Sequence, residues 1–460
     1  MHFKRHITPF LIEWKKSSNR KPLILRGARQ VGKTTLVKQF SKSYKNFILL
    51  NLEREKDIRF FEEFSDVTTI IDALFIENNI QPSQIHETLL FIDEIQESPK
   101  AIALLRYFYE DSPKLNVIAA GSLLEHSIRK IKNFPVGRIQ NLHLYPLNFS
   151  EFLGATDNKI VLEQLNSIPV KKVAHRTLLD LFNSYTIIGG MPEVVKRYVE
   201  SSSISALTTT YESIWSTYKD DVEKYASSKT DARVIKHIMS TAHLYLDERI
   251  KFQNFGNSNY KSREVGEAMR NLDDARIIQL IYPTTNTSPP VKSDLKKSPR
   301  LQFLDTGLVN NELDIQAELL SFSDLSEAYK GAIIPHIITQ ELISLNATKY
   351  RKPNFWVREK KQSSAEVDLV LQHEGMVIPV EIKSGKVGKL KSLHQFIEKS
   401  DHPYAVRMYG GEFSIEEHIT QSGKKYFLMN LPYYLGTKID AYLGWFCKEY
   451  SEKNNHGANS

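Results

Sequence analysis

The eight residues from Gly27 to Thr34 restrict the possible fold of this chain more than any other feature. They read Gly-Ala-Arg-Gln-Val-Gly-Lys-Thr, match the pattern G-x4-G-K-[ST], and lie between an apolar run and an amphipathic stretch. In such a loop, successive backbone N–H groups surround a phosphate at the N-terminus of a helix. The glycines allow backbone torsions and close approaches that a β-carbon prevents. The alternative is a chance match in a turn, which the flanking strand and helix patterns disfavour.

We expect this loop to bind ATP together with Mg²⁺. Lys33 would neutralise the β- and γ-phosphates, and the Thr34 hydroxyl would be a ligand of Mg²⁺. The residues expected to contact the nucleotide are Gly27, Ala28, Arg29, Gln30, Val31, Gly32, Lys33, Thr34 and Thr35.

A second segment, Leu89-Leu90-Phe91-Ile92-Asp93-Glu94, ends in two acids and supports this interpretation. Its four apolar residues predict a buried strand whose carboxyl end places the two acids beside the loop. Asp93 would hold the magnesium through water, and Glu94 would polarise the attacking water as a general base. The alternative for the pair is a solvated strand end or a helix cap.

The first third of the chain alternates short apolar runs with helical patterns, which predicts a parallel α/β sheet with helices on both faces. The expected strands are Lys21–Arg26, Asn46–Asn51, Leu89–Ile92, Asn116–Ala120 and Ile139–Leu144. Ser122 follows the fourth strand and would hydrogen-bond the γ-phosphate or the water, although a Gly-Ser turn is common. Arg138 is either an arginine finger for a neighbouring subunit or a surface arginine in a salt bridge.

After about residue 149 the sequence pattern changes twice, first to helices and then to a second α/β unit. Residues from about Phe149 to Ser240 are continuously helical in pattern, and Ser228–Ile281 predicts three short helices. The segment Tyr282–Arg300, rich in Pro, Thr, Ser and Lys, is either a linker or the wing hairpin of a winged helix. A second α/β unit follows. Its expected helices are Gly331–Leu345 and Leu390–Lys399, and its expected strands are Phe355–Arg358, Glu366–Gln372, Met376–Lys383, Tyr404–Met408 and Tyr426–Asn430.

Three residues of this second unit carry potential chemistry. A hairpin turning at His373-Glu374-Gly375 would bring Asp368 beside Glu381 and Lys383, because side chains alternate across a strand. Two carboxylates that hold a divalent cation, with a lysine orienting water, can cut phosphodiesters. The alternative is an exposed strand face with alternating charges.

These motifs, in this order, resemble a large family of prokaryotic AAA-type ATPases. The resemblance covers about Arg5 to Leu435 and includes Gly121-Ser122, Gly137-Arg138, Pro146-Leu147 and Gly189-Gly190-Met191-Pro192-Glu193. It implies a P-loop NTPase core of AAA type at 1–150, a helical lid at 151–227, a winged helix at 228–310 and a restriction-endonuclease-like α/β domain at 311–440. A polar tail is expected at 441–460.

The resemblance also implies roles for single residues. In related ATPases a Gly-x-Pro turn contacts the nucleotide where others use a lid arginine, so Pro192 would contact ATP here. The Asp368, Glu381 and Lys383 set is similar to the Asp…Glu-x-Lys signature of restriction-like nucleases. An acidic residue is expected soon after Gly331, but Pro335 stands at that place, and Glu341 lies too far along the helix.

Composition permits a nucleic-acid partner. The chain has 460 residues, a formal net charge of +7 and a single cysteine, Cys447, which suits a reducing cytoplasm. Apolar runs are too short to span a membrane. The residues expected to contact DNA, as recognition helix and wing, are Lys261, Arg263, Arg270, Lys292, Lys296 and Lys297. A solvated loop or a protein contact are the alternatives.

We therefore expect a magnesium-dependent ATPase coupled to DNA binding or processing, with a homo-oligomer as one form and nuclease activity left open. The alternative is an ATP-driven signalling or defence switch whose C-terminal domain is inactive and binds a protein partner.

Overall fold

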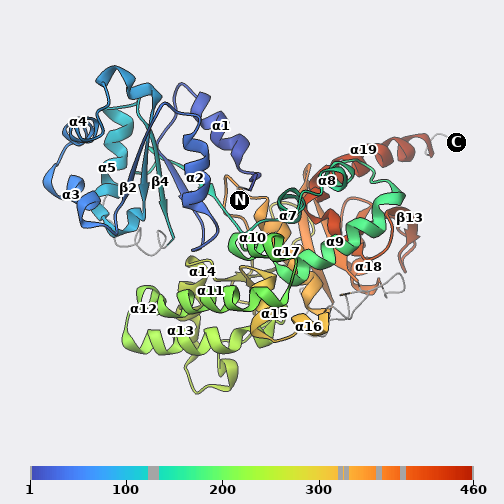
Figure 1. Ribbon diagram of the computed structural model, residues 1–460. Coiled ribbons are helices and arrows are strands. Elements are labelled where there is room, and N and C mark those ends of the chain that lie inside the picture. Colours follow the sequence, from blue (N-terminus) through green and yellow to red (C-terminus); the bar gives the residue numbers. More distant parts are fainter. Residues whose placement is uncertain are drawn as a thin grey trace.

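The computed structural model describes residues 3–122, 134–319, 325, 331–358, 365–383 and 390–457. Figure 1 shows three parts: an α/β unit at the upper left, a helical unit below it, and a second α/β unit on the right. No helix in these ranges is both long enough and apolar enough to cross a membrane.

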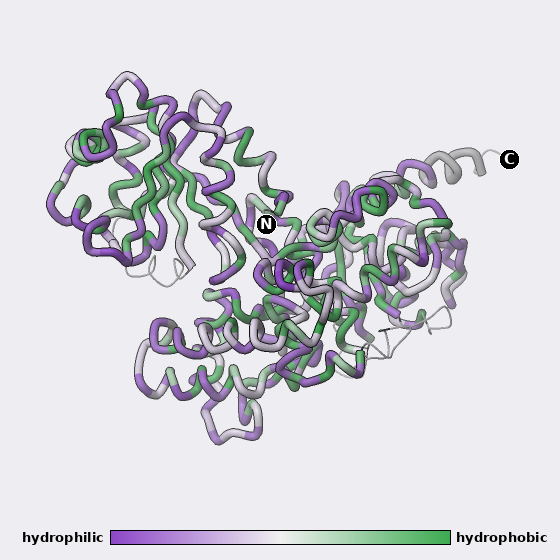
Figure 2. The backbone as a smooth tube through the Cα atoms, viewed as in Figure 1, coloured by the Kyte–Doolittle hydropathy of each residue, from purple (hydrophilic) through white to green (hydrophobic). Residues whose placement is uncertain are grey.

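The N-terminal unit is built on a parallel sheet. Within the described residues it has five strands in the order β2-β3-β4-β1-β5. Their bounds are β1 Leu23–Arg26, β2 Asn46–Asn51, β3 Thr88–Asp93, β4 Asn116–Gly121 and β5 Gln140–His143. Each lies where the sequence predicts a strand, and Figure 2 shows the hydrophobic colour running along them. Strands β3 and β4 are buried over their whole length, as expected for strands covered on both faces.

Helices cover both faces of this sheet (Figure 1). The helices α1 Thr8–Lys16 and α2 Lys33–Ser41 pack on one face through the cluster that contains Leu25 and Phe91. The helices α3 Glu55–Glu63, α4 Val67–Glu77 and α5 Pro99–Glu110 pack on the other face. The carboxyl ends of the central strands β1 and β3 remain open, and there the candidate site lies.

The helical unit begins with a well-capped helix, α7 Phe149–Ala155. The Asn148 side chain accepts from the Glu151 backbone, and the Glu151 side chain accepts from the Asn148 backbone. The helices that follow are α8 Lys159–Leu165, α9 His175–Ile188, α10 Pro192–Ser201, α11 Thr208–Asp220, α12 Val222–Tyr225, α13 Lys229–Thr241 and α14 Ser262–Asp274. Helix α14 then leads into a two-stranded antiparallel sheet of β6 Ile278–Ile281 and β8 Arg300–Phe303.

The segment between β6 and β8 is more than a linker or a free wing. It contains a short strand, β7 Pro283–Thr284, that pairs in parallel with β9 Asn354–Val357 of the second α/β unit. Trp356 Nε1 donates to the Thr285 carbonyl at 3.2 Å, and Thr287 Oγ1 donates to the Lys399 carbonyl at 3.2 Å. The segment is therefore anchored along the edge of the C-terminal sheet.

That C-terminal sheet has seven strands within the described residues, in the order β13-β14-β12-β11-β10-β9-β7. The other strands are β10 Glu366–His373, β11 Met376–Ile382, β12 Tyr404–Tyr409, β13 Ser414–Ile419 and β14 Lys425–Pro432. The helices of this part are α15 Thr306–Glu312, α16 Gln316–Leu319, α17 Ile333–Ser344, α18 Lys391–Ile397 and α19 Ile439–Gly457. Short 3-10 helices are η1 Pro82–Glu87, η2 Ile95–Glu97, η3 Lys172–Ala174, η4 Ser205–Leu207, η5 Ala242–Tyr245, η6 Phe255–Asn257 and η8 Tyr433–Lys438.

The expected polar tail at 441–460 is wrong in its first part, where α19 carries buried apolar side chains. The apolar residues Tyr442, Leu443 and Phe446 are fully buried in the main hydrophobic core. Their helical spacing places them on one face, and their burial stabilises a helix that the sequence analysis did not predict.

Candidate functional site

The loop Gly27–Gly32 connects β1 to α2 in the conformation that a phosphate cradle requires. Gly32 precedes α2 with φ of 94°, in the left-handed region. A β-carbon on Gly27 would lie 2.4 Å from the Leu144 carbonyl oxygen, so a larger residue would displace the neighbouring strand. Both glycines are therefore required by geometry, as the sequence predicts.

Lys33 is held inside this loop. Its ammonium donates to the carbonyls of Gly27 at 3.0 Å and Ala28 at 2.8 Å. Burial lowers the pKa of Lys33 to about 8, although the nearby acids Glu94 and Asp93 oppose this shift. A bound phosphate would supply the negative charge that favours the ammonium.

The expected magnesium ligands meet across the sheet edge. The Thr34 hydroxyl donates to Asp93 Oδ2 at 2.7 Å, which joins the start of α2 to the end of β3. Burial raises the pKa of Asp93, and the Thr34 hydrogen bond opposes this shift. Hydroxyl and carboxylate oxygens are the donors that Mg²⁺ prefers, so these two residues fit that ion.

Glu94 follows with φ of 50°, a left-handed conformation that is uncommon for a residue with a β-carbon. This turn directs its carboxylate to the cavity that Lys33 and Thr34 also line. The Gln96 side-chain amide donates to Glu94 Oε2 at 2.6 Å. Gln96 is 7% exposed, so it holds the carboxylate from inside the protein.

A cavity of about 540 Å³ lies above the loop, large enough for a nucleotide. Its walls come from the N-terminal segment, the loop, α2, α10 and α11. The lining residues are Phe3, Arg5, Arg29, Gln30, Gly32, Lys33, Thr34, Thr35, Leu36, Gln39, Glu53, Glu94, Pro192, Glu193, Lys196 and Thr217. The expected nucleotide contacts that line this space are Arg29, Gln30, Gly32, Lys33, Thr34, Thr35 and Pro192, whereas Gly27, Ala28 and Val31 are not among the lining residues.

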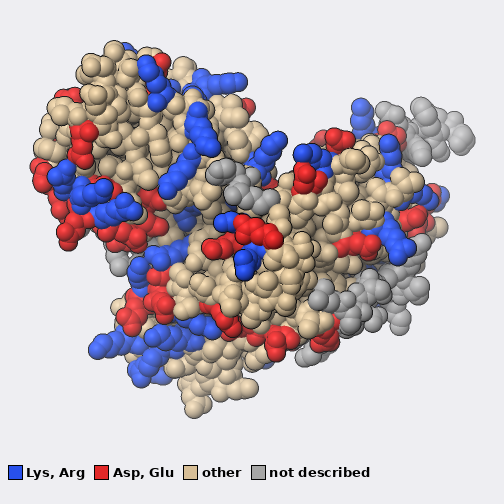
Figure 3. Space-filling view, viewed as in Figure 1, with Lys and Arg blue, Asp and Glu red and all other residues tan. Residues whose placement is uncertain are grey.

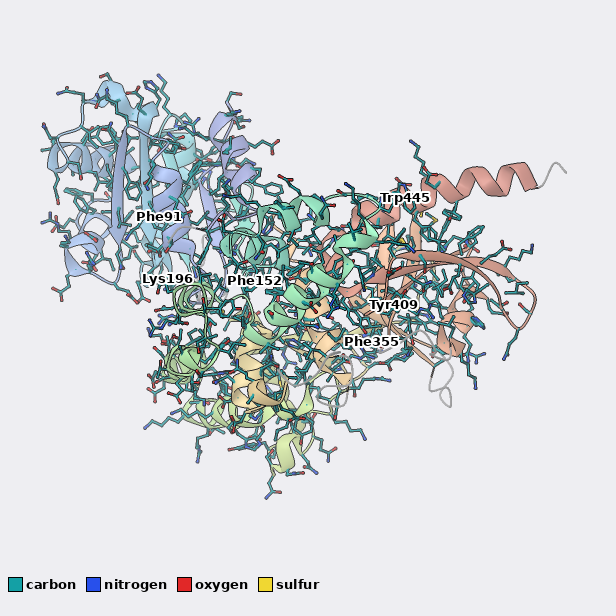
Figure 4. All side chains as sticks on the ribbon, turned by 45° about the vertical axis from the view of Figure 1, so that its right-hand side comes forward. Phe91, Phe152, Lys196, Phe355, Tyr409 and Trp445 are labelled. Atoms are coloured by element: carbon teal, nitrogen blue, oxygen red, sulfur yellow. The ribbon has the colours of Figure 1, made fainter. Side chains whose placement is uncertain are left out.

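Sequence reasoning missed two cations of this cavity. Lys196 lies on α10 four residues after Pro192, one helical turn along, where the α/β unit meets the helical unit (Figure 4). Arg5 reaches the cavity from the N-terminal segment and is fixed by three contacts: Glu151 at 3.0 Å, the Val31 carbonyl at 3.0 Å and the Tyr145 carbonyl at 2.5 Å. The helical period after Pro192 could have identified Lys196, whereas no local pattern identifies Arg5.

The loop is also tied to the helical unit. Arg29 pairs with Asp221 at 2.8 Å, at the junction of α11 and α12. The Tyr218 hydroxyl donates to the Arg29 carbonyl at 2.8 Å, and Gln30 donates to Thr217 at 3.3 Å. The side chains of two expected nucleotide contacts are thus engaged by α11 and its C-terminal end.

The two remaining expected catalytic residues lie outside the cavity lining. Ser122 Oγ accepts from Arg29 Nε at 3.3 Å, so it contacts the loop through the Arg29 side chain. Arg138 pairs with Glu110 at 2.8 Å on the surface, beside Arg106. Within one chain, Arg138 therefore forms the salt bridge that the sequence left open as an alternative.

The Gly189-Gly190 pair lies where three parts of the chain cross. The Gly190 carbonyl accepts from Leu147 N at 2.7 Å, and Gly190 N donates to Asp305 Oδ2 at 2.6 Å. A β-carbon on Gly190 would lie 1.9 Å from the Leu147 carbonyl oxygen, so glycine is required for this approach. The helix that carries Pro192 and Lys196 starts directly from this crossing.

The three residues of the nuclease-like set come together as the hairpin predicts. Strands β10 and β11 pair in antiparallel register around Glu374-Gly375. Asp368 Oδ2 accepts from Ile382 N at 2.8 Å, and Lys383 Nζ pairs with Glu381 Oε1 at 2.6 Å.

Glu341 contacts the helical unit instead of this set. Its carboxyl group accepts from Phe149 N at 3.1 Å and contacts the Tyr185 hydroxyl at 2.7 Å. It therefore does not replace the acidic residue that is absent at Pro335.

The residues expected to contact DNA divide into two places. Lys261, Arg263 and Arg270 are exposed on or beside α14, and Arg263 pairs with Glu267 at 3.0 Å. The others lie on the segment that is anchored to the C-terminal sheet: Lys292 and Lys296 are exposed, and Lys297 is half-buried and 3.9 Å from Asp294.

Comparisons with known proteins agree with the nucleotide site around Gly27–Thr34. Residues 19–153 match a family of AAA domains. Residues 179–319 match a domain of unknown function, DUF8612, and residues 330–433 match another, DUF4143. No match was found among curated proteins.

Several solved structures are similar over part of the chain. A Walker-type ATPase of Pyrococcus abyssi is 16% identical, with a TM-score of 0.43, over 68% of this chain and 96% of that one. The S. cerevisiae Hsp104-ADP complex is 14% identical, with a TM-score of 0.27, over 60% of this chain and 40% of that one. A STAND signal-transduction ATPase of Pyrococcus horikoshii with a tetratricopeptide repeat sensor is 12% identical, with a TM-score of 0.27, over 73% and 47%. The match of residues 19–153 and the loop geometry together identify the N-terminal third of the chain as an AAA-type P-loop ATPase domain.

Proposed function

We propose that the chain is a magnesium-dependent ATP hydrolase whose cycle changes the contact between the AAA-type domain and the helical unit. The observation that carries this proposal is that Lys33, Thr34 and Glu94 line one cavity, with Asp93 hydrogen-bonded to Thr34 beside it. The residues that would hold Mg²⁺ are Thr34 and, through water, Asp93. The ion would supply positive charge to the phosphates in the transition state.

The chain's own residues divide the remaining work. The Lys33 ammonium leaves the carbonyls of Gly27 and Ala28 and binds the phosphates. The Glu94 carboxylate, held by Gln96, accepts a proton from the attacking water. The positive charges of Arg5 and Lys196 line the same cavity and favour an anionic ligand there.

Two substitutions test the site. Lys33→Ala should abolish ATP binding measured by isothermal titration calorimetry, because the loop loses its phosphate-binding cation. Glu94→Gln should keep binding and abolish hydrolysis, since the amide cannot accept the proton. Hydrolysis by Lys33→Ala at the wild-type rate would refute the assignment.

We also propose that the helical unit contacts DNA. Figure 3 shows lysines and arginines gathered at the lower left, over α12 and α13. The exposed cations on or beside helices α12, α13 and α14 are Lys224, Lys229, Arg233, Lys236, Lys261, Arg263 and Arg270. Such a surface can neutralise several phosphates, which makes DNA binding strongly dependent on salt. The anchored segment carrying Lys292 and Lys296 would contribute only from its exposed edge.

Fluorescence anisotropy with a labelled duplex tests this surface. The double variant Arg233→Gln/Arg270→Gln should bind DNA more weakly and with a smaller salt slope, by about one unit for each phosphate that is no longer neutralised. The matched control Arg106→Gln, on α5 of the N-terminal unit, should leave both quantities unchanged.

A signalling switch is the second candidate, and the Arg29–Asp221 contact favours it. ATP that recruits Arg29 would release α11 from the loop and free the helical unit to assemble with other chains. ATP-dependent oligomerisation without DNA affinity, measured by light scattering and anisotropy, would support the switch against the DNA-binding proposal.

A further inference from the structure

An arginine from the helical unit enters the acidic pocket of the C-terminal sheet. Arg300 begins β8, and its side chain is only 13% exposed. It pairs with Asp247 at 3.1 Å, with Glu366, and with Asp368 at 3.6 Å. One guanidinium therefore contacts three carboxylates that come from two different parts of the chain.

The orientation of this guanidinium is fixed by an aromatic ring. Its central carbon lies 4.7 Å from the ring centroid of Phe355, which Figure 4 labels on β9. A planar cation stacked on an aromatic face and forked toward carboxylates is held more firmly than a lysine would be. The arrangement is that of a built-in ion cluster.

The oxygens that a metal ion would need are largely engaged. Asp368 Oδ2 accepts from the Ile382 backbone, and Asp368 Oδ1 faces Arg300. Glu381 Oε1 pairs with Lys383. Of the carboxylate oxygens of Asp368 and Glu381, as the structure describes them, Glu381 Oε2 is buried and lacks a hydrogen-bond partner. Mg²⁺ is held in proteins by one or two carboxylates together with waters, and here Asp368 and Glu381 are already paired with the cations Arg300 and Lys383.

The charges support the same conclusion. Burial raises the pKa of Glu381 to about 7, and the neighbouring Asp368 charge adds to this shift. Burial also raises the pKa of Asp247 to about 7, although Arg300 opposes it. In the described ranges, moreover, no group of three or more His, Cys, Asp and Glu side chains is placed to hold a metal ion.

We infer that Arg300 occupies the position that a divalent cation would take between Asp368 and its neighbours, so that this pocket binds no metal and joins β8 to the C-terminal sheet. The pocket then acts as an electrostatic junction between the helical unit and the second α/β unit. It does not cut phosphodiesters by the metal-dependent route that its Asp, Glu and Lys set suggests.

Manganese binding to the nucleotide-free full-length chain tests this inference, with isothermal titration calorimetry as the readout. Wild type and Asp368→Asn should bind Mn²⁺ identically, because Asp368 is not a metal ligand. Arg300→Met should gain one equivalent of Mn²⁺, and the double variant Arg300→Met/Asp368→Asn should lose it again. Arg249→Met is the matched control, since Arg249 also pairs with Glu366, at 3.6 Å, but from a more exposed position. It should gain nothing.

Two outcomes would overturn the inference. One is a Mn²⁺ site in wild type that Asp368→Asn removes. The other is a folded Arg300→Met chain, with a wild-type circular dichroism spectrum, that gains no Mn²⁺. If Arg300→Met does not fold, the comparison of wild type with Asp368→Asn still decides the question. Any Mn²⁺ bound at Thr34 and Asp93 of the ATP site is common to all of these variants, so the differences between them stand apart from the proposed hydrolase activity.

Discussion

Replacing Glu341 with glutamine should change how the stability of the chain responds to pH. Glu341 lies on α17 and joins the second α/β unit to the start of α7 through Phe149 and Tyr185. It is fully buried, and this burial raises its pKa from 4.5 to about 8. The folded chain therefore keeps the carboxyl protonated at neutral pH, whereas the unfolded chain ionises it.

The sign of the effect follows from this difference. A carboxyl with a raised pKa contributes its full stability below pH 4.5 and loses it as pH rises toward the folded value of about 8. Each pH unit in this interval costs about 1.4 kcal/mol. Between pH 6 and pH 8 the wild-type chain should lose roughly 2 to 3 kcal/mol through this one group.

Glutamine keeps an oxygen that can accept from Phe149 N but does not titrate. Urea unfolding followed by circular dichroism, at pH 6 and pH 8, should show the Glu341→Gln variant gaining that amount relative to wild type at the higher pH. Equal pH dependence in the two proteins would refute the reasoning and mean that the carboxylate is ionised in the folded state.

Two predictions concern the nucleotide cavity. Lys196→Ala should weaken ATP binding about five- to tenfold in calorimetry, since a half-exposed lysine near phosphate contributes about 1 kcal/mol; its neighbour Arg197→Ala, outside the cavity lining, should bind as wild type, and equal losses in both would contradict a specific contact. Gln96→Leu should lower kcat for ATP hydrolysis and leave the Kd for ATP unchanged, because Gln96 holds Glu94 and is not among the residues that line the cavity. A matching loss of affinity would show that Gln96 supports the fold of the site instead.

Much of the N-terminal unit could be predicted because its signals are local. A phosphate loop, a buried strand ending in two acids and an alternating pattern each occupy a short stretch of sequence. The β10–β11 hairpin was predictable for the same reason, since a turn at Glu374-Gly375 fixes the register that places Asp368 beside Glu381.

The missed features depend on contacts between distant parts of the chain. Strand β7 has two residues and exists because β9, some seventy positions later, offers an unpaired edge. Arg300 resembles a surface cation of a linker until the fold brings Asp247 and Asp368 to it. Arg5 is held at the cavity by Glu151 and by the carbonyls of Val31 and Tyr145. Such residues carry no periodicity or spacing that could identify them from sequence.

The parallel pairing of β7 with β9 has a mechanical consequence. Backbone hydrogen bonds between β7 and β9 resist separation, so the β6–β8 sheet next to α14 should move together with the C-terminal sheet. The AAA-type domain contacts the downstream parts at the Gly189-Gly190 crossing, at Glu341 and at His143, which contacts Ala347 and Arg276. A movement that ATP drives should therefore rotate both downstream parts together about these contacts.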